Sequence, residues 1–450
     1  MNPLLHGLAH LADPEPRLFE GRVYLYGSLD QEGGKGYCSA SYRVFSCPQE
    51  DLSAWVDEGE ILARKDLPPE AKGNLWAPDC VQGEDGYYYL YFFTQGLNAI
   101  LVARSPSPKG PFAYLGKVRH DSGIPLGEKS YDPVCFDPAV FKDDDGKIYL
   151  HFGFSPDALA RGKYYRKRFN PAGPSVVELG SDMLTIARGP RRIGIPGVSG
   201  DEGSEFAGHA FFEAPSLRKI MGRYFFIYSS QAHHELCFAY SVFPDRDFHF
   251  GGVLLSNAST VIAGKEEAMA GGNNHGSILQ LHDSYYLFYH RHLGESETCR
   301  DVCLERLRLN EEGLFERAFP SSGGLAVLPA NGELSAALIL AGKSPRERSL
   351  LTIKKGAYLF RFARDGEYGA ISALAFENPR AASIEATCLG GGVLLLSASL
   401  GGSPIAEIPL WESKARQTFA SFCQPVEGEH PLYLEYRGPG RLDLYLLRFA

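Results

Sequence analysis

The chain has 450 residues, 44% of them hydrophobic and 22% charged, so it is long enough for two domains with substantial cores. Its net charge of -9 gives no electrostatic support for nucleic-acid binding, and a neutral, sugar-like ligand fits better than an anionic polymer. The many Gly, Pro, Tyr and Phe residues are typical of a protein built from strands and turns.

The beginning of the chain and the cysteines bear on the compartment. The first residues, MNPLLHGLAHLADPEP, lack a basic region followed by a sustained apolar run, which predicts neither a signal peptide nor a membrane span. The nine cysteines are scattered without a CxxC pair, as expected for buried thiols in a reducing compartment. We therefore expect a cytoplasmic protein with no membrane partner.

A short phrase recurs five times along residues 1–318: an anchor residue, a turn about nine residues later, and an aromatic strand. The anchors lie 64, 60, 76 and 62 positions apart, and they are Asp13, Ala77, Asp137, Glu213 and His275. Five similar units of this period predict a five-bladed β-propeller, in which equivalent positions meet near the central axis. We therefore expect the three acids and the histidine to converge there.

The pattern changes after residue 318. Ser, Gly and Pro interrupt the strands over residues 319–332, which predicts a linker. Residues 333–450 return to short alternating strands, including GAYLFRFA and RLDLYLLRFA, and these indicate a β-sandwich. The sequence thus predicts an all-β protein with a propeller domain over 1–318 and a sandwich domain over 333–450.

Three carboxyl groups and an imidazole around one pocket are suited to acid–base hydrolysis of a glycosidic bond. Hydrolysis with inversion needs a protonated acid at the leaving oxygen and an ionised base that activates water on the opposite face. A neighbouring carboxylate raises the pKa of the acid because it disfavours a second negative charge, and Asp137 is the candidate neighbour of Glu213.

Several phrases together resemble glycoside hydrolase family 43. They are ADP (12–14), LWAPD (75–79), FDPAVFKDDDGKIYL (136–150), GHAFFEAPSLRK (208–219), NNHGSI (273–278) and FYHRH (288–292). That family comprises inverting β-xylosidases, α-L-arabinofuranosidases, arabinanases and some galactosidases on a five-bladed propeller. The resemblance therefore implies an O-glycosyl hydrolase whose chemistry requires no cofactor.

The resemblance also implies roles for individual residues. Asp13 would be the general base, Glu213 the general acid, and Asp137 the carboxylate that raises the pKa of the acid and orients it. His275 would lie beside water or a structural Ca²⁺ or Na⁺ on the propeller axis. Three further residues are expected at the substrate: Arg291 as a contact to sugar or catalytic carboxylates, Trp76 as an aromatic wall, and His209, four residues before the acid.

The expected activity is release of terminal α-L-arabinofuranosyl or β-D-xylosyl residues from plant-type oligosaccharides, from a dead-end pocket. The sequence leaves open a galactosidase or galactofuranosidase of the same fold, a retaining fructosidase-like enzyme, and a non-catalytic propeller that binds glycans. Because the insertion over residues 191–208 could shape the pocket, the sequence does not determine which sugar is accepted. It does not determine the oligomeric state either.

The last strands resemble a family 6 carbohydrate-binding module, but Asp443 and Tyr445 stand roughly where that module has Asn and Trp. Packing against the propeller is therefore a stronger expectation for this domain than sugar binding.

Overall fold

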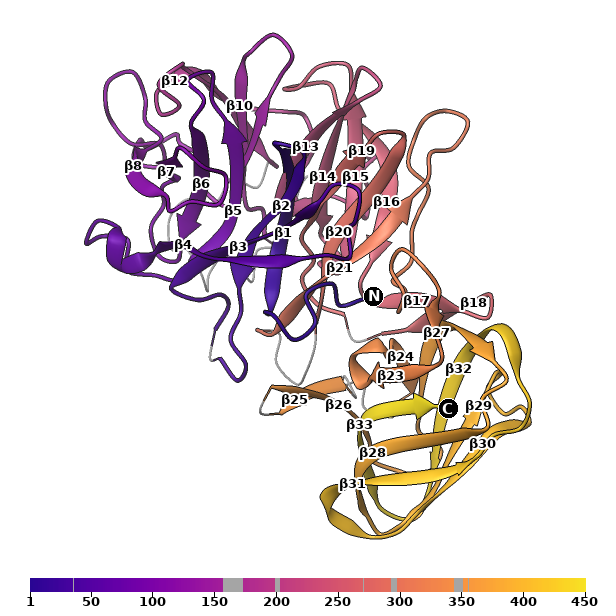
Figure 1. Ribbon diagram of the computed structural model, residues 1–450. Helices are drawn as coiled ribbons and strands as arrows, with labels where there is room; N and C mark the ends of the chain where they lie inside the picture. Colours follow the sequence, from indigo (N-terminus) through magenta and orange to yellow (C-terminus); the bar gives the residue numbers. More distant parts are fainter. Residues whose placement is uncertain are drawn as a thin grey trace.

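The computed structural model describes residues 1–34, 36–156, 173–198, 203–269, 271–292, 298–343, 351–354 and 356–450 (Figure 1). Within these ranges the chain is almost entirely β-structure, and its helical segments are two short 3₁₀ turns, Arg64–Asp66 and Ala336–Leu338. None of the described helices has the length and apolar character needed to cross a membrane.

The described part of the first 307 residues forms five antiparallel sheets, the blades of a β-propeller, each with its strands in chain order. Blade 1 has β1 (Leu11–Phe19), β2 (Arg22–Leu29), β3 (Ser41–Pro48) and β4 (Val56–Ala63), and blade 2 has β5 (Leu75–Gln82), β6 (Tyr88–Thr94), β7 (Leu101–Ser105) and β8 (Ala113–Lys117). Blade 3 has β9 (Ala139–Lys142), β10 (Ile148–Phe152), β11 (Ser175–Leu179) and β12 (Ile186–Arg192), and blade 4 has β13 (Phe211–Ile220), β14 (Arg223–Ser230), β15 (Glu235–Ser241) and β16 (His249–Ser256). Blade 5 has β19 (Gly276–Leu281), β20 (Ser284–His292) and β21 (Arg300–Leu307), so the predicted propeller is confirmed.

The N-terminal segment completes the three-stranded fifth blade. The backbone N–H of Leu4 donates to the carbonyl of Val302 at 2.8 Å. The side chain of Asn2 donates to the carbonyl of Leu304 at 3.1 Å and accepts from the N–H of Leu304 at 2.9 Å. These bonds occupy the outer edge of β21 with the beginning of the chain, which fastens the last blade to the first.

The first strand of a blade carries a bulge where its anchor lies. Four residues that precede a proline there have positive φ: Asp13 (52°), Ala77 (36°), Asp137 (46°) and Ala214 (62°). The strand pairing shifts register across this position in blades 1, 2 and 4. The prediction that Glu213 shares the anchor position is therefore wrong by one residue, because Ala214 holds it.

Beneath the anchors a ring of buried polar groups ties the blades together. Arg17 binds Asp79 of the next blade through Nε and Nη2 and also donates to the carbonyl of Val140 in blade 3 at 2.8 Å. Arg218 of blade 4 donates to Glu15 of blade 1 at 2.7 Å and to the carbonyl of Ile278 in blade 5 at 2.8 Å. Each charge is compensated away from water, so the ring fixes how the inner strands lie around the axis.

The C-terminal part is a sandwich of two six-stranded sheets, as predicted. One sheet has β22 (Leu328–Pro329), β27 (Tyr368–Glu377), β32 (Glu427–Arg437), β29 (Gly392–Ser397) and β30 (Pro404–Leu410), with β24 (Ala341–Lys343) on β27. The other has β25 (Leu351–Lys354), β26 (Ala357–Phe362), β33 (Arg441–Phe449), β28 (Ala381–Leu389) and β31 (Ser413–Phe422), with β23 (Gly332–Ser335) on β33. The first of these strands begins within the segment predicted as a linker.

The sandwich packs against blade 5 and against the hairpin of β17 (Ser259–Ile262) and β18 (Lys265–Ala268), which reaches towards it (Figure 1). The hydroxyl of Tyr358 donates to the buried carboxylate of Asp301, and the hydroxyl of Tyr368 donates to Glu267 at 2.9 Å. In the sandwich, Asp443 is buried and paired with Arg361 at 2.8 Å, so this carboxylate stabilises the domain.

Candidate active site

The bulges bring the predicted acids and histidine to one place on the axis. His275 Nδ1 lies 3.7 Å from Asp13 Oδ1 and 3.8 Å from Asp137 Oδ2. Asp137 also contacts blade 4, where its Oδ2 accepts the backbone N–H of Ala214 at 3.2 Å. Because Ala214 directly follows Glu213, this bond fixes the backbone that carries the third carboxyl group. Groups from blades 1, 3, 4 and 5 therefore meet here.

Asp13 is held in its ionised form. Burial opposes ionisation, but Arg300, His275 and His290 lower the pKa of Asp13 to about 2. Arg300 Nη1 donates to Asp13 Oδ1 at 2.9 Å, and its Nε and Nη2 bind Asp30 at 2.8 and 3.0 Å. Asp30 thus holds the guanidinium in place for Asp13. Neither Asp30 nor Arg300 was predicted from the sequence alone.

Glu213, in contrast, favours its protonated form. Burial and, after it, the negative charge of Asp13 raise the pKa of Glu213 to about 8. Burial, Glu213 and Asp13 likewise raise the pKa of Asp137 well above its ordinary value. At neutral pH the site therefore combines an ionised carboxylate at Asp13 with a carboxylic acid at Glu213, the two forms that acid–base catalysis requires.

A chain of hydrogen bonds runs from Asp13 to the wall of a cavity. The backbone N–H of Asp13 donates to His290 Nδ1 at 3.1 Å, so the proton of this imidazole is on Nε2. That Nε2 then donates to the carbonyl of Asn273 at 2.7 Å, and His292 Nε2 binds the same carbonyl at 2.8 Å. Asn273 lines the cavity, so His290 connects the backbone of Asp13 to the cavity wall through two hydrogen bonds.

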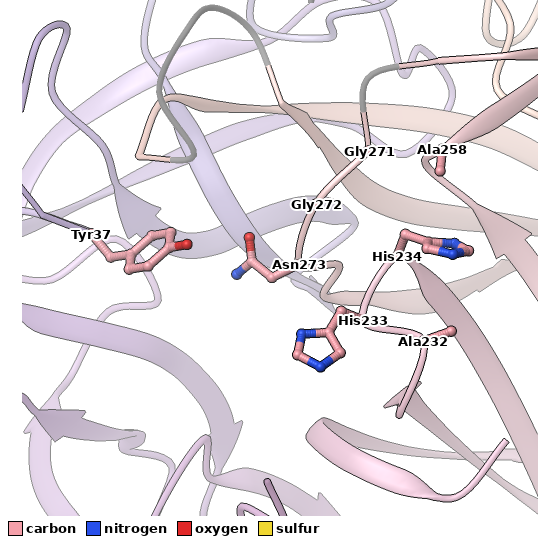
Figure 2. A pocket seen from close by; sticks show the side chains of 8 residues that line it. All are labelled: Tyr37, Ala232, His233, His234, Ala258, Gly271, Gly272 and Asn273. Carbon is pink, nitrogen blue, oxygen red and sulfur yellow. The ribbon is translucent and has the colours of Figure 1, made fainter. Parts of the chain in front are cut away.

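The cavity has a volume of about 320 Å³, and Figure 2 shows Tyr37 on one side with the adjacent residues His233 and His234 on the other. Its remaining lining residues are Ala232, Ala258, Gly271, Gly272 and Asn273. The ring of His233 stacks on Phe212, with centroids 4.1 Å apart, and Phe212 precedes Glu213. The ring of Tyr37 lies 4.9 Å from the Arg300 guanidinium, so the lining of the cavity contacts neighbours of both Glu213 and Asp13.

Trp76 lies next to this lining. Its ring meets Tyr37 edge-on at 6.1 Å and packs against Phe93 at 5.7 Å and Phe136 at 5.8 Å. The indole N–H is buried and has no hydrogen-bond acceptor among the described residues. Trp76 is thus part of an aromatic cluster beside the cavity lining, and its indole N–H is buried within that cluster.

The structure places Arg291 away from the carboxylates, which corrects the role expected for it. His290 and His292 lie on one face of β20, and Arg291 between them points to the other face because side chains alternate along a strand. Its Nη2 donates to the carbonyl of Ile339 in the sandwich at 3.3 Å. Arg300, opposite His292 on the neighbouring strand, provides the guanidinium instead.

The side-chain hydrogen bond and the ring stacking of His209 are also not with Asp13, Asp137 or Glu213. Its Nδ1 lies 3.0 Å from Glu235 Oε2, and its ring stacks on Phe250 with centroids 5.1 Å apart. This histidine therefore belongs to a separate group in blade 4. Part of the insertion that precedes it, residues 199–202, lies outside the described residues.

An axial Ca²⁺ or Na⁺ would be held by His275, with waters as further ligands. Both ions prefer oxygen ligands, and Ca²⁺ takes six to eight of them. Burial lowers the pKa of His275, so the imidazole is neutral and able to bind a cation. His275 offers only one nitrogen, so the oxygen ligands of such an ion would have to come from water or from Asp13 and Asp137, whose oxygens lie 3.7 and 3.8 Å from His275 Nδ1.

Comparisons with known proteins show the family and the fold of the chain. The sequence profile of glycosyl hydrolases family 43 matches residues 2–315. A curated xylosidase/arabinosidase of Thermoclostridium stercorarium is 36% identical, with 98% of this chain and 97% of the relative covered. A solved β-xylosidase/α-arabinofuranosidase from a compost microbial metagenome, in complex with xylotriose, is 29% identical with a TM-score of 0.56, covering 71% of this chain and 97% of its own.

A third comparison extends over both parts of the fold. An arabinoxylan arabinofuranohydrolase of Bacillus subtilis, solved in complex with cellotetraose, covers 100% of this chain and 97% of its own with a TM-score of 0.54. Its identity is 22%, so the likeness shows that the propeller and the sandwich share their fold with that protein.

Proposed function

Because the chain belongs to glycosyl hydrolases family 43 and is therefore a glycoside hydrolase, we propose that it releases terminal β-D-xylosyl or α-L-arabinofuranosyl residues from oligosaccharides with inversion at the anomeric carbon. The single observation that carries the mechanism is that two neighbouring carboxyl groups beside the cavity favour opposite protonation states. Asp13 has a pKa lowered to about 2, and Glu213 has a pKa raised to about 8.

In the proposed reaction, Asp13 accepts a proton from a water molecule as the water oxygen bonds to the anomeric carbon. Glu213 gives its proton to the leaving oxygen as the glycosidic bond breaks, so the products are the free sugar and the shortened alcohol. Arg300 keeps Asp13 ionised, and Asp137 positions the backbone beside the acid through its bond to the Ala214 N–H. The next turnover requires the proton to return from Asp13 to Glu213 through solvent.

The size of the cavity supports action at chain ends. Its volume of about 320 Å³ lies at the low end of the range of ligand pockets, about 300–1,000 Å³. Such a space suits one terminal sugar and part of its neighbour. Pentoses are favoured because the names of the relatives above join xylosidase and arabinosidase activity.

The experiment that tests the substrate class is kcat/KM on 4-nitrophenyl β-D-xylopyranoside and α-L-arabinofuranoside against the β-D-galactopyranoside and β-D-galactofuranoside. The proposal predicts that one or both pentosides are preferred at least about tenfold over either galactoside, because one extra or missing methylene in a pocket costs about 1–3 kcal/mol. A preference for a galactoside would instead favour the galactosidase alternative.

An axial cation at His275 is a separate part of the proposal, and no step above uses it. If Ca²⁺ is bound, dialysis against a chelator lowers the unfolding temperature, and Ca²⁺ restores it; if Na⁺ is bound, exchange of Na⁺ for a large organic cation lowers it instead. An unfolding temperature and a kcat that are unchanged by both treatments would remove the ion from this account.

A further inference from the structure

A second group of donor atoms lies in blade 4, apart from the carboxylates. His209 Nδ1, a Glu235 carboxylate oxygen and Cys237 Sγ all lie within 4.8 Å of one another. The nitrogen is 3.0 Å from Glu235 Oε2 and 3.9 Å from Cys237 Sγ. In a tetrahedral site with Zn–N of about 2.0–2.1 Å and Zn–S of about 2.3 Å, neighbouring ligand atoms are about 3.3–3.7 Å apart. Both His209 distances are within a few tenths of an ångström of this range, and the Glu235–Cys237 pair, which lies within 4.8 Å, would close towards it when an ion binds.

The three donors are held in place by other contacts. The carbonyl of His209 accepts the Tyr228 hydroxyl at 2.8 Å, and the His209 ring stacks on Phe250. Ser230 donates its hydroxyl to the same Glu235 oxygen at 3.0 Å. Glu235 and Cys237 are two residues apart on β15, so both side chains lie on one face of the strand. Little side-chain freedom would be lost when an ion binds.

The three donor side chains differ in their solvent exposure. The Cys237 side chain is fully buried, whereas 32% of the His209 side chain and 18% of the Glu235 side chain are exposed. An ion can therefore enter past His209 while the sulfur is shielded from solvent and oxidants.

We propose that His209, Glu235 and Cys237 form a structural Zn²⁺ site, with water as the fourth ligand. Nitrogen, oxygen and thiolate together select Zn²⁺ over Ca²⁺ or Mg²⁺, which take oxygen ligands. Binding displaces the thiol proton to solvent, because the thiolate is the ligand. The site is distinct from an axial cation at His275, which has no sulfur donor in its contacts.

A bound ion would join the segment that precedes β13 to the strand that follows a cavity-lining turn. His209 precedes β13, which carries Glu213, and Glu235 begins β15 directly after the turn that carries His233 and His234. Zn²⁺ would therefore stiffen the rim of the cavity without contact to the reacting atoms. The proposed Zn²⁺ site goes beyond the glycosidase reaction and does not depend on it.

The test is a titration of the metal-free full-length protein with Co²⁺, which replaces Zn²⁺ and reports its ligands by absorption. We expect one equivalent to give a thiolate-to-cobalt charge-transfer band and the visible band of tetrahedral cobalt, and stoichiometric Zn²⁺ to abolish both. Cys237→Ser should abolish the charge-transfer band, and His209→Gln should weaken Co²⁺ affinity at least about tenfold.

Cys388→Ser is the matched control because it removes another buried strand cysteine, in the sandwich. It should leave both cobalt bands unchanged, and the unfolding temperature should rise with Zn²⁺ in the wild type and in this control only. Should Cys237→Ser fold poorly, Glu235→Gln tests the same site from a partly exposed position. A wild type with no charge-transfer band, or a band that persists in Cys237→Ser, would overturn the proposal.

Discussion

Arg300 Nη1 donates to Asp13 Oδ1 at 2.9 Å, and this contact joins the last blade of the propeller to the first. One ion pair thus contributes both to closing the ring and to keeping the proposed base ionised. Because Asp30 binds the other side of the same guanidinium, the position of the positive charge is fixed before substrate binds.

Loss of the Arg300 charge should shift the acidic limb of the pH profile. In Arg300→Gln the pKa of Asp13 rises, because the largest influence that opposes burial is lost and only His275, His290 and a hydrogen bond with Ser28 still lower it, so kcat/KM begins to fall at higher pH. Arg300→Lys keeps a charge but cannot bind Asp30 and Asp13 together, and we expect an intermediate limb. The measurement is kcat/KM across pH on one aryl pentoside.

Arg291→Gln is the matched control for that experiment. Arg291 donates to the carbonyl of Ile339 in the sandwich, so the pH profile of Arg291→Gln should coincide with that of the wild type. Its unfolding temperature should fall because the Ile339 bond is lost. A displaced acidic limb in Arg291→Gln, together with a normal one in Arg300→Gln, would reverse the two roles.

Removal of the acid should depend on the leaving group. Glu213→Gln should lower kcat/KM by about 10²–10⁴ on natural oligosaccharides and 4-methylphenyl glycosides, whose leaving oxygens need a proton. On 2,4-dinitrophenyl glycosides the loss should be much smaller, because that phenolate leaves unprotonated. Equal losses on both kinds of substrate would show that Glu213 is not the acid.

The basic limb should report the coupled pair of Asp137 and Glu213. The acid must be protonated, so activity falls as the pH rises through its pKa of about 8, while the base stays ionised down to about 2. Glu213 raises the pKa of Asp137, and by reciprocity an ionised Asp137 raises that of Glu213. In Asp137→Asn the basic limb of kcat/KM should therefore move to lower pH. An unchanged basic limb would restrict the role of Asp137 to its hydrogen bond with the Ala214 N–H.

The buried ring should dominate stability. Asp79 is fully buried and binds Arg17 as well as the backbone N–H of Cys80 and Val140. Asp79→Asn removes the closest counter-charge of the buried Arg17 guanidinium and leaves it Glu15 at 3.9 Å, so the loss should approach about 3–5 kcal/mol, the cost of breaking a buried pair. Glu266→Gln, at the exposed pair with Arg317, should cost at most about 1 kcal/mol. Denaturant unfolding of both variants checks the difference, and equal losses would contradict the structural role of the ring.

The period of the aromatic phrases was sufficient to predict the blades, because each blade repeats the same turn and strand. It was not sufficient to fix the alignment of Glu213, since the equivalent residue is defined by the proline that follows it and by positive φ. Aligning Pro14, Pro78, Pro138 and Pro215 would have assigned the anchor of blade 4 to Ala214.

Arg300 and the polar ring were missed for a different reason. Their partners are far apart in the sequence, so only the folded chain shows that Arg300 meets Asp13 and Asp30, or that Arg218 meets Glu15. Alternation along FYHRH does carry a signal, because it places Arg291 on the opposite face from its neighbouring histidines. The sugar bound in the cavity depends on loops whose conformation no short motif determines.

The stereochemistry of hydrolysis tests the central claim most directly. Proton NMR during hydrolysis of a 4-nitrophenyl β-D-xyloside resolves the anomer that appears before mutarotation. If Asp13 is a base that activates water opposite Glu213, the first xylose released is the α-anomer. Release of β-xylose first would make Asp13 a nucleophile and would contradict the account.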